Sequence, residues 1–184
     1  MAKKRIRVTA KTSDFAFITD VRLRGDVEDA LYFTAYLIDA GDKTRLNRYK
    51  EEFYRATVLY IASVIEALCL FFIDNKKLVG TKHEYKYERP LNFPPISLTE
   101  GELICAIKVK RNLALKDIPF FEAIKILEQN NLFPKQLAKK INEVRLARNT
   151  QHLYSRSSGR MSDKEVKNAF DTLNRLFAQI RKNV

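Results

Sequence analysis

A long apolar segment in the first half of the chain constrains the fold more than any other feature. Between about Thr44 and Asn75, apolar side chains recur at helical spacing, which predicts one long helix. The recurring positions are Phe53, Thr57, Tyr60, Val64, Leu68 and Phe71. Because the other side of this helix is apolar as well, neighbouring elements must surround it. Glu66, in the middle of the apolar stretch from Ala56 to Ile73, favours the central helix of a bundle over a membrane span.

The size and composition of the chain fit a helical bundle. With 184 residues and 46% hydrophobic content, the chain is long enough for one sizeable core, and we predict a single domain over residues 1–184. Five glycines and five prolines are too few for the turns of a many-stranded sandwich or barrel. The predicted fold class is therefore mostly α, an antiparallel bundle of about five to six helices with a small hairpin or loop insertion.

Further helices are expected on both sides of the long one. The first has acidic residues near its start and Gly41 as its stop, and the last opens with a capping box at Ser162 and Glu165. The expected ranges are Asp26 to Ala40, Leu98 to Arg111, Pro119 to Asn130, Pro134 to about His152, and Ser162 to the end of the chain. The expected core residues of the last two are Leu137, Ile141, Val144 and Leu146, and then Val166, Phe170, Leu173, Leu176, Phe177 and Ile180.

Two segments lie outside the predicted helices. Residues 1–25 are expected to form a basic N-terminal arm, which lacks the apolar region of a signal peptide. Residues 76–98 are expected to form an insertion, because two tyrosines alternate with charged residues before three prolines; this pattern predicts a hairpin followed by an extended loop. Cys69 and Cys105 lie in apolar stretches without metal-ligand spacing, which predicts buried thiols in a reducing cytoplasm.

The formal charge of +12 is concentrated at the two ends of the chain. Residues 1–11 carry +5, residues 12–134 carry −1 and residues 135–184 carry +8. Clustered lysine and arginine side chains gain free energy on a polyanion through the release of counterions, so we expect a nucleic acid as the partner. A membrane is not expected, because the last helix has no large apolar insertion face. A solvated basic surface that aids solubility is the alternative.

The C-terminal basic region contains one of the two histidines of the chain beside two arginines. On a helix, with about 100° between successive residues, Arg145, Arg148 and His152 fall on one face. Guanidinium groups bind phosphate oxygens in a bidentate manner, and an imidazole titrates near neutral pH and can transfer protons. The group is therefore suited to a phosphodiester. The alternatives are that the arginines only complement the negative end of their helix, and that His152 caps this helix or is bonded in the core.

Three sequence motifs follow one another along the chain. The long helix contains Tyr60-Ile61-Ala62-Ser63-Val64-Ile65-Glu66-Ala67, a later segment leads from Ala123 to Arg148-Asn149, and His152-Leu153-Tyr154 comes next. Together they resemble the HEPN superfamily, the higher-eukaryote and prokaryote nucleotide-binding helical domains. The likeness is to the central helix of that family, to its Arg-Asn-containing motif, and to the His-x-Tyr extension of toxin members paired with minimal nucleotidyltransferases. It covers roughly residues 26–75 and 98–182.

The spacing of the motif leaves two candidates for its arginine. The family pattern places four to six residues between arginine and histidine. Three residues separate Arg148 from His152, whereas six separate Arg145 from His152. The family also favours a polar residue after its arginine, and Asn149 follows Arg148. Both arginines are therefore candidates.

The resemblance implies metal-independent RNA cleavage, in which the ribose 2′-hydroxyl attacks the adjacent phosphate. His152 would act as general base or acid, and Arg145 or Arg148 would stabilise the charge that builds on the phosphate oxygens. We expect Asn149, Tyr154 and Glu66 to support the site, and Arg156 and Arg160 of the basic loop that follows to bind RNA.

The resemblance also implies a biological setting. It suggests a cytoplasmic toxin or phage-defence component, an antitoxin or nucleotidyltransferase as protein partner, and a homodimer in which two motifs face one cleft. No metal ion or cofactor is expected. The sequence contains no Gly-rich phosphate loop, no Cys/His ligand set and no Gly-x-Ser-x-Gly elbow, so hydrolysis of nucleoside triphosphates and zinc chemistry are not expected either.

Two other functions are alternatives. A catalytically inactive HEPN-like module that binds RNA or protein is favoured by the short spacing after Arg148 and by the insertion. A DNA-binding helical pair over residues 119–150 is disfavoured, because its linker is an ordinary one. Two of these residues also have structural explanations. The apolar neighbours of Glu66 predict that its carboxylate forms an ion pair with an arginine. Tyr154 would suit a position in the core or at an interface.

Overall fold

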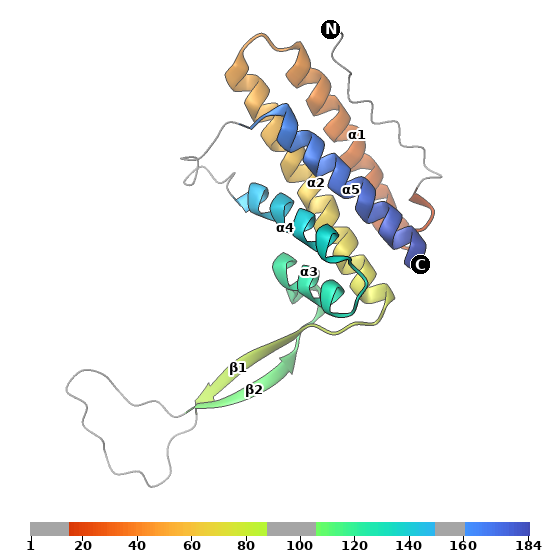
Figure 1. The fold of residues 1–184 in the computed structure, drawn as a ribbon, viewed down its shortest axis with the longest axis vertical. Coiled ribbons are helices and arrows are strands. Elements are labelled where there is room, and N and C mark those ends of the chain that lie inside the picture. Colours follow the sequence, from red (N-terminus) through yellow and green to blue (C-terminus); the bar gives the residue numbers. More distant parts are fainter. Residues whose placement is uncertain (1–14, 88–105, 150–160) are drawn as a thin grey trace, which may run out of the picture.

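The computed structural model describes residues 15–87, 106–149 and 161–184, and these parts confirm the mostly α fold class. They contain five α-helices, one short 3-10 helix and one two-stranded sheet (Figure 1). The α-helices are α1 (Val21–Lys43), α2 (Asn47–Asn75), α3 (Phe120–Gln129), α4 (Lys135–Asn149) and α5 (Asp163–Asn183). The other elements are β1 (Thr81–Tyr87), β2 (Ala106–Asn112) and the 3-10 helix η2 (Leu115–Asp117).

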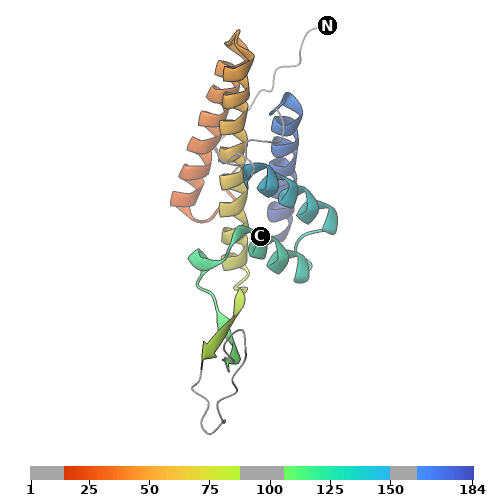
Figure 2. The ribbon, with the colours of Figure 1, turned by 90° about the vertical axis from the view of Figure 1, so that its left-hand side faces the viewer.

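Helix α2 is the central helix of the bundle, as its apolar sequence predicts. It contacts α1, α3, α4 and α5, and Figure 2 shows it between α1 on one side and α4 and α5 on the other. Thr57, Val64 and Leu68 of the predicted stripe are buried. Tyr60 was expected on the same stripe but is 42% exposed, and Ser63 beside it is exposed too. The described helices therefore leave one side of α2 open to solvent.

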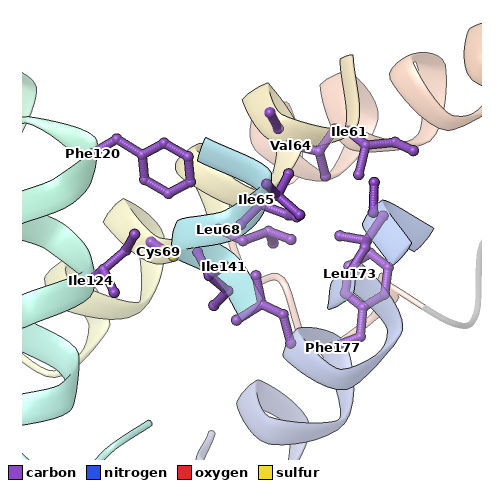
Figure 3. Packing of buried hydrophobic residues seen from close by; sticks show 14 of the residues in the cluster. Ile61, Val64, Ile65, Leu68, Cys69, Phe120, Ile124, Ile141, Leu173 and Phe177 are labelled. Carbon is purple, nitrogen blue, oxygen red and sulfur yellow. The ribbon is translucent and has the colours of Figure 1, made fainter. Parts of the chain in front are cut away.

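The apolar side chains of α2 build the core of the protein. The helix is long and apolar enough to cross a membrane, yet 61% of its most apolar window is buried inside the protein. Figure 3 shows this packing around Ile61, Ile65 and Leu68 of α2, Phe120 and Ile124 of α3, Ile141 of α4, and Leu173 and Phe177 of α5. Such burial is compatible with a soluble protein.

Helix α1 extends beyond both predicted ends. Asp20 caps its start, since the Oδ1 atom of Asp20 accepts a hydrogen bond of 3.0 Å from the backbone N–H of Leu23. Gly41 lies inside the helix, so its predicted role as the helix stop is wrong. A Cβ atom at Gly41 would lie 3.1 Å from the Cβ atom of Phe53, which shows that the missing side chain lets α1 and α2 approach closely.

The segment before α1 joins the core. Phe15 and Ile18 are buried, and the rings of Phe15 and Phe17 pack edge-on against Phe177, with centroid distances of 5.3 and 5.7 Å. Residues 21–25 form the first turns of α1. The predicted boundary of the basic arm at residue 25 is therefore wrong, because these apolar side chains anchor the chain to α5. Residues 1–14 lie outside the described part of the chain.

Helices α4 and α5 follow the predicted pattern with one exception. The capping box of α5 is confirmed: Oγ of Ser162 accepts a hydrogen bond from the N–H of Lys164, and the N–H of Ser162 donates to Glu165. All the predicted core residues of α5 are buried. Leu146 of α4 was expected in the core but is 47% exposed, because it lies about 200° around the helix from the buried Val144.

A hairpin takes the place of part of the helix predicted from Leu98 to Arg111. Strands β1 and β2 pair antiparallel, with Thr81 opposite Asn112 and Tyr87 opposite Ala106. Within β2, two β-branched residues alternate with lysines, and this two-residue period suits a strand. The hairpin projects from the helical bundle (Figures 1 and 2), and the insertion therefore continues to Asn112 instead of ending at residue 98. Residues 88–105 lie outside the described structure.

Candidate active site

Glu66 joins the central helix to the end of α4. Its carboxylate extends from the middle of α2, and its Oε2 atom accepts a hydrogen bond of 2.5 Å from Nη1 of Arg148. The side chains of Arg148 and Glu66 are 35% and 26% exposed, so water screens this ion pair only in part. The arginine partner predicted for Glu66 is confirmed, and the pair fixes the guanidinium of Arg148 against α2.

Arg145 lies one turn before Arg148 on the same helix. Its Nε atom donates a hydrogen bond of 2.8 Å to Oδ1 of Asn142, one turn earlier again. Residues three apart on a helix are neighbours on its surface, so the two arginines extend on the same side of α4. Arg148 also stands in the last turn, where a cation complements the negative end of the helix dipole. The position of Arg148 is therefore compatible with contact to a phosphate and with stabilisation of the helix end.

These side chains line an open pocket of about 500 Å³, which we call the arginine pocket. Its polar residues are Glu66, Arg145, Arg148 and Asn149, and its apolar residues are Leu59, Pro119, Phe120 and Phe121. Two guanidinium groups and one carboxylate give this lining a net charge of +1. Pockets for small ligands typically measure about 300–1,000 Å³. The arginine pocket can therefore admit a phosphate together with part of a nucleotide.

The structure brings together the predicted site residues of α2 and α4. Glu66, Arg145, Arg148 and Asn149 share the arginine pocket. The remaining predicted residues, His152, Tyr154, Arg156 and Arg160, lie within residues 150–160, outside the described part of the chain. Over the residues that the structure does describe, no three histidine, cysteine, aspartate or glutamate side chains gather to form a metal-binding group.

The aromatic wall of the arginine pocket was not predicted from the sequence. Phe120 and Phe121 follow Pro119 at the start of α3, and they are 6% and 43% exposed. Neighbouring residues on a helix point about 100° apart, so one ring enters the core while the other stays outside it. The available signal was a pair of phenylalanines on a helix that needs only one of them for its core.

Cys69, the cysteine that the structure describes, is not placed to act as a nucleophile. Cys69 lies one turn after Glu66 on α2 and is fully buried, as predicted. Burial raises the pKa of this thiol strongly, and the negative charge of Glu66 raises the pKa further. Only the thiolate attacks an electrophile, so a thiol that stays protonated at neutral pH is inert. Cys105 falls outside the described residues.

We expect Cys69 to resist alkylation while the protein is folded. In a Cys105→Ser variant, iodoacetamide at pH 8 should modify Cys69 at least about 100-fold more slowly in the native protein than in the unfolded protein, because the thiol is both buried and protonated. Mass spectrometry of a time course gives both rates. The same variant in guanidinium chloride is the control. Similar rates in the two conditions would show that the thiol is accessible.

An exposed group of aromatic side chains lies on α1 and α2. We call it the aromatic patch and define it as Tyr32, Phe33, Tyr36 and Tyr60, with exposures of 63%, 40%, 63% and 42%. The ring of Phe33 packs edge-on against Tyr60, with 4.9 Å between centroids, and stacks near Tyr36 at 6.1 Å. Tyr60 directly follows Leu59, a residue of the arginine pocket. Contiguous apolar patches on a soluble protein commonly mark interaction surfaces.

Comparison with known proteins gave no relative for this chain: no protein-family model, no curated protein and no solved structure matches it.

Proposed function

We propose that the chain is a HEPN-type endoribonuclease that cleaves RNA without a metal ion, and that the arginine pocket is its active site. The observation that carries the proposal is the convergence of Arg145, Arg148 and Asn149 on one open pocket, with Glu66 holding the end of α4 against α2. Fixed guanidinium groups stabilise the negative charge that develops on phosphate oxygens during cleavage. The charge of +8 on residues 135–184 supports RNA as the substrate.

The reaction needs a group that transfers protons, and we assign this role to His152. This residue follows Asn149, the last residue of α4, by three positions, and three residues of extended chain span at most about 11 Å. His152 takes the proton of the ribose 2′-hydroxyl as the 2′-oxygen bonds to phosphorus. The bond from phosphorus to the 5′-oxygen breaks, and the imidazolium gives its proton to that oxygen. The products are a 2′,3′-cyclic phosphate and a 5′-hydroxyl.

The contacts of the two arginines support different roles for them. The carboxylate of Glu66, 2.5 Å from Arg148, offsets much of the positive charge of that guanidinium. The side-chain partner of Arg145 is Asn142, which is neutral, so Arg145 retains its full charge for a phosphate. We therefore assign the main phosphate contact to Arg145, which also has the six-residue spacing to His152. Arg148 anchors the wall of the pocket to α2.

The test is the incubation of purified protein with RNA in the presence of EDTA. We expect cleavage products with 2′,3′-cyclic phosphate and 5′-hydroxyl ends, identified by mass spectrometry, because the 2′-oxygen is the nucleophile. The same sequence made of DNA should stay intact, since it lacks that hydroxyl. Cleavage of the DNA, or products with a 3′-hydroxyl end, would contradict this mechanism. Binding of RNA without cleavage would support the catalytically inactive module instead.

We also propose that a second copy of the chain binds at the aromatic patch. The patch lies on α1 and on the open side of α2, where the described helices leave Tyr60 and Ser63 exposed. Aromatic side chains are enriched in the cores of protein interfaces. Because Tyr60 adjoins Leu59 of the arginine pocket, association here would bring two arginine pockets toward each other and increase the positive field on one RNA.

The variant Tyr36→Arg/Tyr60→Arg is expected to dissociate this homodimer. Two buried cations in each protomer would lose hydration without gaining a partner, so the Kd of the dimer should rise at least about tenfold. Sedimentation velocity over a range of concentrations measures the effect. Tyr49→Arg is the matched control, because Tyr49 is 46% exposed on α2 but lies outside the aromatic patch. A wild-type protein that stays monomeric at every concentration would contradict the proposal.

The resemblance to HEPN proteins extends the proposal to a biological setting. We propose that the chain acts in the cytoplasm as a toxin or a phage-defence component. A nuclease that cleaves the RNA of its own cell must be inhibited until it is needed. An antitoxin or a nucleotidyltransferase partner would provide this inhibition. No metal ion or cofactor takes part in the proposed reaction.

A further inference from the structure

Phe121 belongs to two pockets at once. Together with Pro119 it lines the arginine pocket, and the same two residues line a second pocket of about 760 Å³. We call this second one the hairpin pocket, because residues 81–84 and 111–112 of the hairpin form one of its walls. The ring of Phe121 is 43% exposed, and the exposed Nζ of Lys125 lies 5.2 Å from its centroid. A group in contact with this ring is therefore within reach of both pockets.

The hairpin pocket differs from the arginine pocket in its electrostatics. Its acidic residues are Glu84, Asp117 and Glu122, and its basic residues are Lys82 and Arg111, with His83 and Asn112 beside them. With His83 neutral, this lining carries a net charge of −1, against +1 for the arginine pocket. A phosphate group is therefore favoured in the arginine pocket and disfavoured in the hairpin pocket. A neutral group that donates hydrogen bonds suits the hairpin pocket instead.

We infer that the hairpin pocket is a subsite for a nucleobase next to the phosphate held by Arg145, an inference that rests on the proposed function. The base stacks on Phe121 and donates hydrogen bonds to the carboxylate of Glu122, the residue that follows it in α3. Glu122 is 27% exposed, and its contact with Lys125 is a loose one of 3.9 Å near the surface, which a ligand can replace. Bases are accessible in this manner only in a single strand, so the substrate is unpaired RNA at this point.

A carboxylate at this position distinguishes among the four bases. Guanine presents two adjacent donors on its pairing edge, the ring N1–H and the amino group, and these match the two oxygens of a carboxylate. Adenine and cytosine present one amino group next to an acceptor nitrogen. Uracil presents one N–H between two carbonyl oxygens, which a carboxylate repels. The subsite is therefore selective for guanine.

The test measures binding apart from cleavage. Oligonucleotides of 2′-O-methyl RNA cannot be cleaved by 2′-hydroxyl attack, and fluorescence anisotropy gives their Kd. We expect oligouridine with one central guanine to bind the wild-type protein about tenfold more tightly than oligouridine alone. Phe121→Ala should weaken binding of both oligonucleotides about tenfold, since stacking contributes to each, and Phe121→Trp should restore it. Glu122→Gln should remove only the preference for guanine.

Two matched controls accompany the binding measurements, and the cleavage assay on unmodified RNA separates the subsite from the proposed function. Tyr49→Ala removes an exposed aromatic ring elsewhere, and Glu128→Gln removes a carboxylate of α3 outside both pockets; neither should change binding. Unchanged binding by Phe121→Ala, or a guanine preference that survives Glu122→Gln, would overturn the subsite even if the wild type cleaves RNA. The expected binding pattern without any cleavage would keep the subsite and overturn the nuclease. Absence of binding to every oligonucleotide would overturn both.

Discussion

Replacement of both arginines of the arginine pocket by alanine is expected to lower the rate of RNA cleavage at least about 10²-fold, because removal of a single charge-stabilising donor commonly has an effect of this size. The Arg145→Ala/Arg148→Ala variant leaves Glu66 as the charged residue of the described lining, so the net charge of this lining changes from +1 to −1. Negative charge then repels the phosphate on which the reaction builds further charge. Single-turnover rates at saturating RNA report this loss apart from weaker binding.

The control for this variant lies on the same helix. Lys135→Ala/Lys139→Ala removes two exposed cations of α4 that do not line the arginine pocket, so the change in total charge is identical. This control should weaken RNA binding through the general field and leave the saturated rate unchanged. An equal loss in both variants would favour the solvated basic surface over a specific site.

His152→Ala should lower the rate of RNA cleavage by about 10²–10⁴-fold, the usual contribution of a general acid or base. Melting curves accompany these assays, because Arg148→Ala also removes the ion-pair partner of Glu66.

Most of the helical fold could be predicted from periodicity alone. The centres of α2, α3 and α5 follow the apolar spacing, since a helix that packs on a core must repeat its apolar residues every three to four positions. The small hairpin was expected, but its second strand was assigned to a helix, because Ala106–Asn112 is short and no residue of it is fully buried, so no buried face marks its two-residue period. Gly41 was misplaced for a different reason. Its role depends on the approach of Phe53 from another helix, which local sequence does not record.

The candidate site was predictable to the extent that it is local. Arg145 and Arg148 share a face because they stand three residues apart on one helix, and a sequence pattern is sufficient to show it. An ion pair between Glu66 and an arginine was expected, but the sequence did not indicate which arginine. Arg148 is 82 residues away in the chain, and nothing in the sequence distinguishes it from the other arginines as the partner. Phe121 joins the site only through the way α3 packs beside α2 and α4. The hairpin pocket likewise combines residues of β1, β2 and α3, which no periodicity connects.

Phe72→Ala is expected to lower the free energy of unfolding by about 3–5 kcal/mol, the usual cost of a large cavity at a buried phenylalanine. Phe72 of α2 has no exposed surface, and its ring stacks against Phe133, with 6.1 Å between centroids and an interplanar angle of 24°. Phe133 is buried in the connection between α3 and α4. The cavity would therefore weaken the packing that holds α4, the helix that carries both arginines of the pocket, against α2. For a chain of this size the Tm should fall by roughly 6–20 °C.

Urea denaturation followed by far-UV circular dichroism measures this loss of stability, and Phe121→Ala is the matched control. Both variants remove the same ring, but Phe121 is 43% exposed at the edge of two pockets, whereas Phe72 is enclosed. The control should change the free energy of unfolding by no more than about 0.5 kcal/mol, as is usual for surface positions. Equal losses in the two variants would mean that the ring of Phe121 supports the core. Phe121 would then be retained for packing, and its exposure toward the two pockets would need no functional explanation.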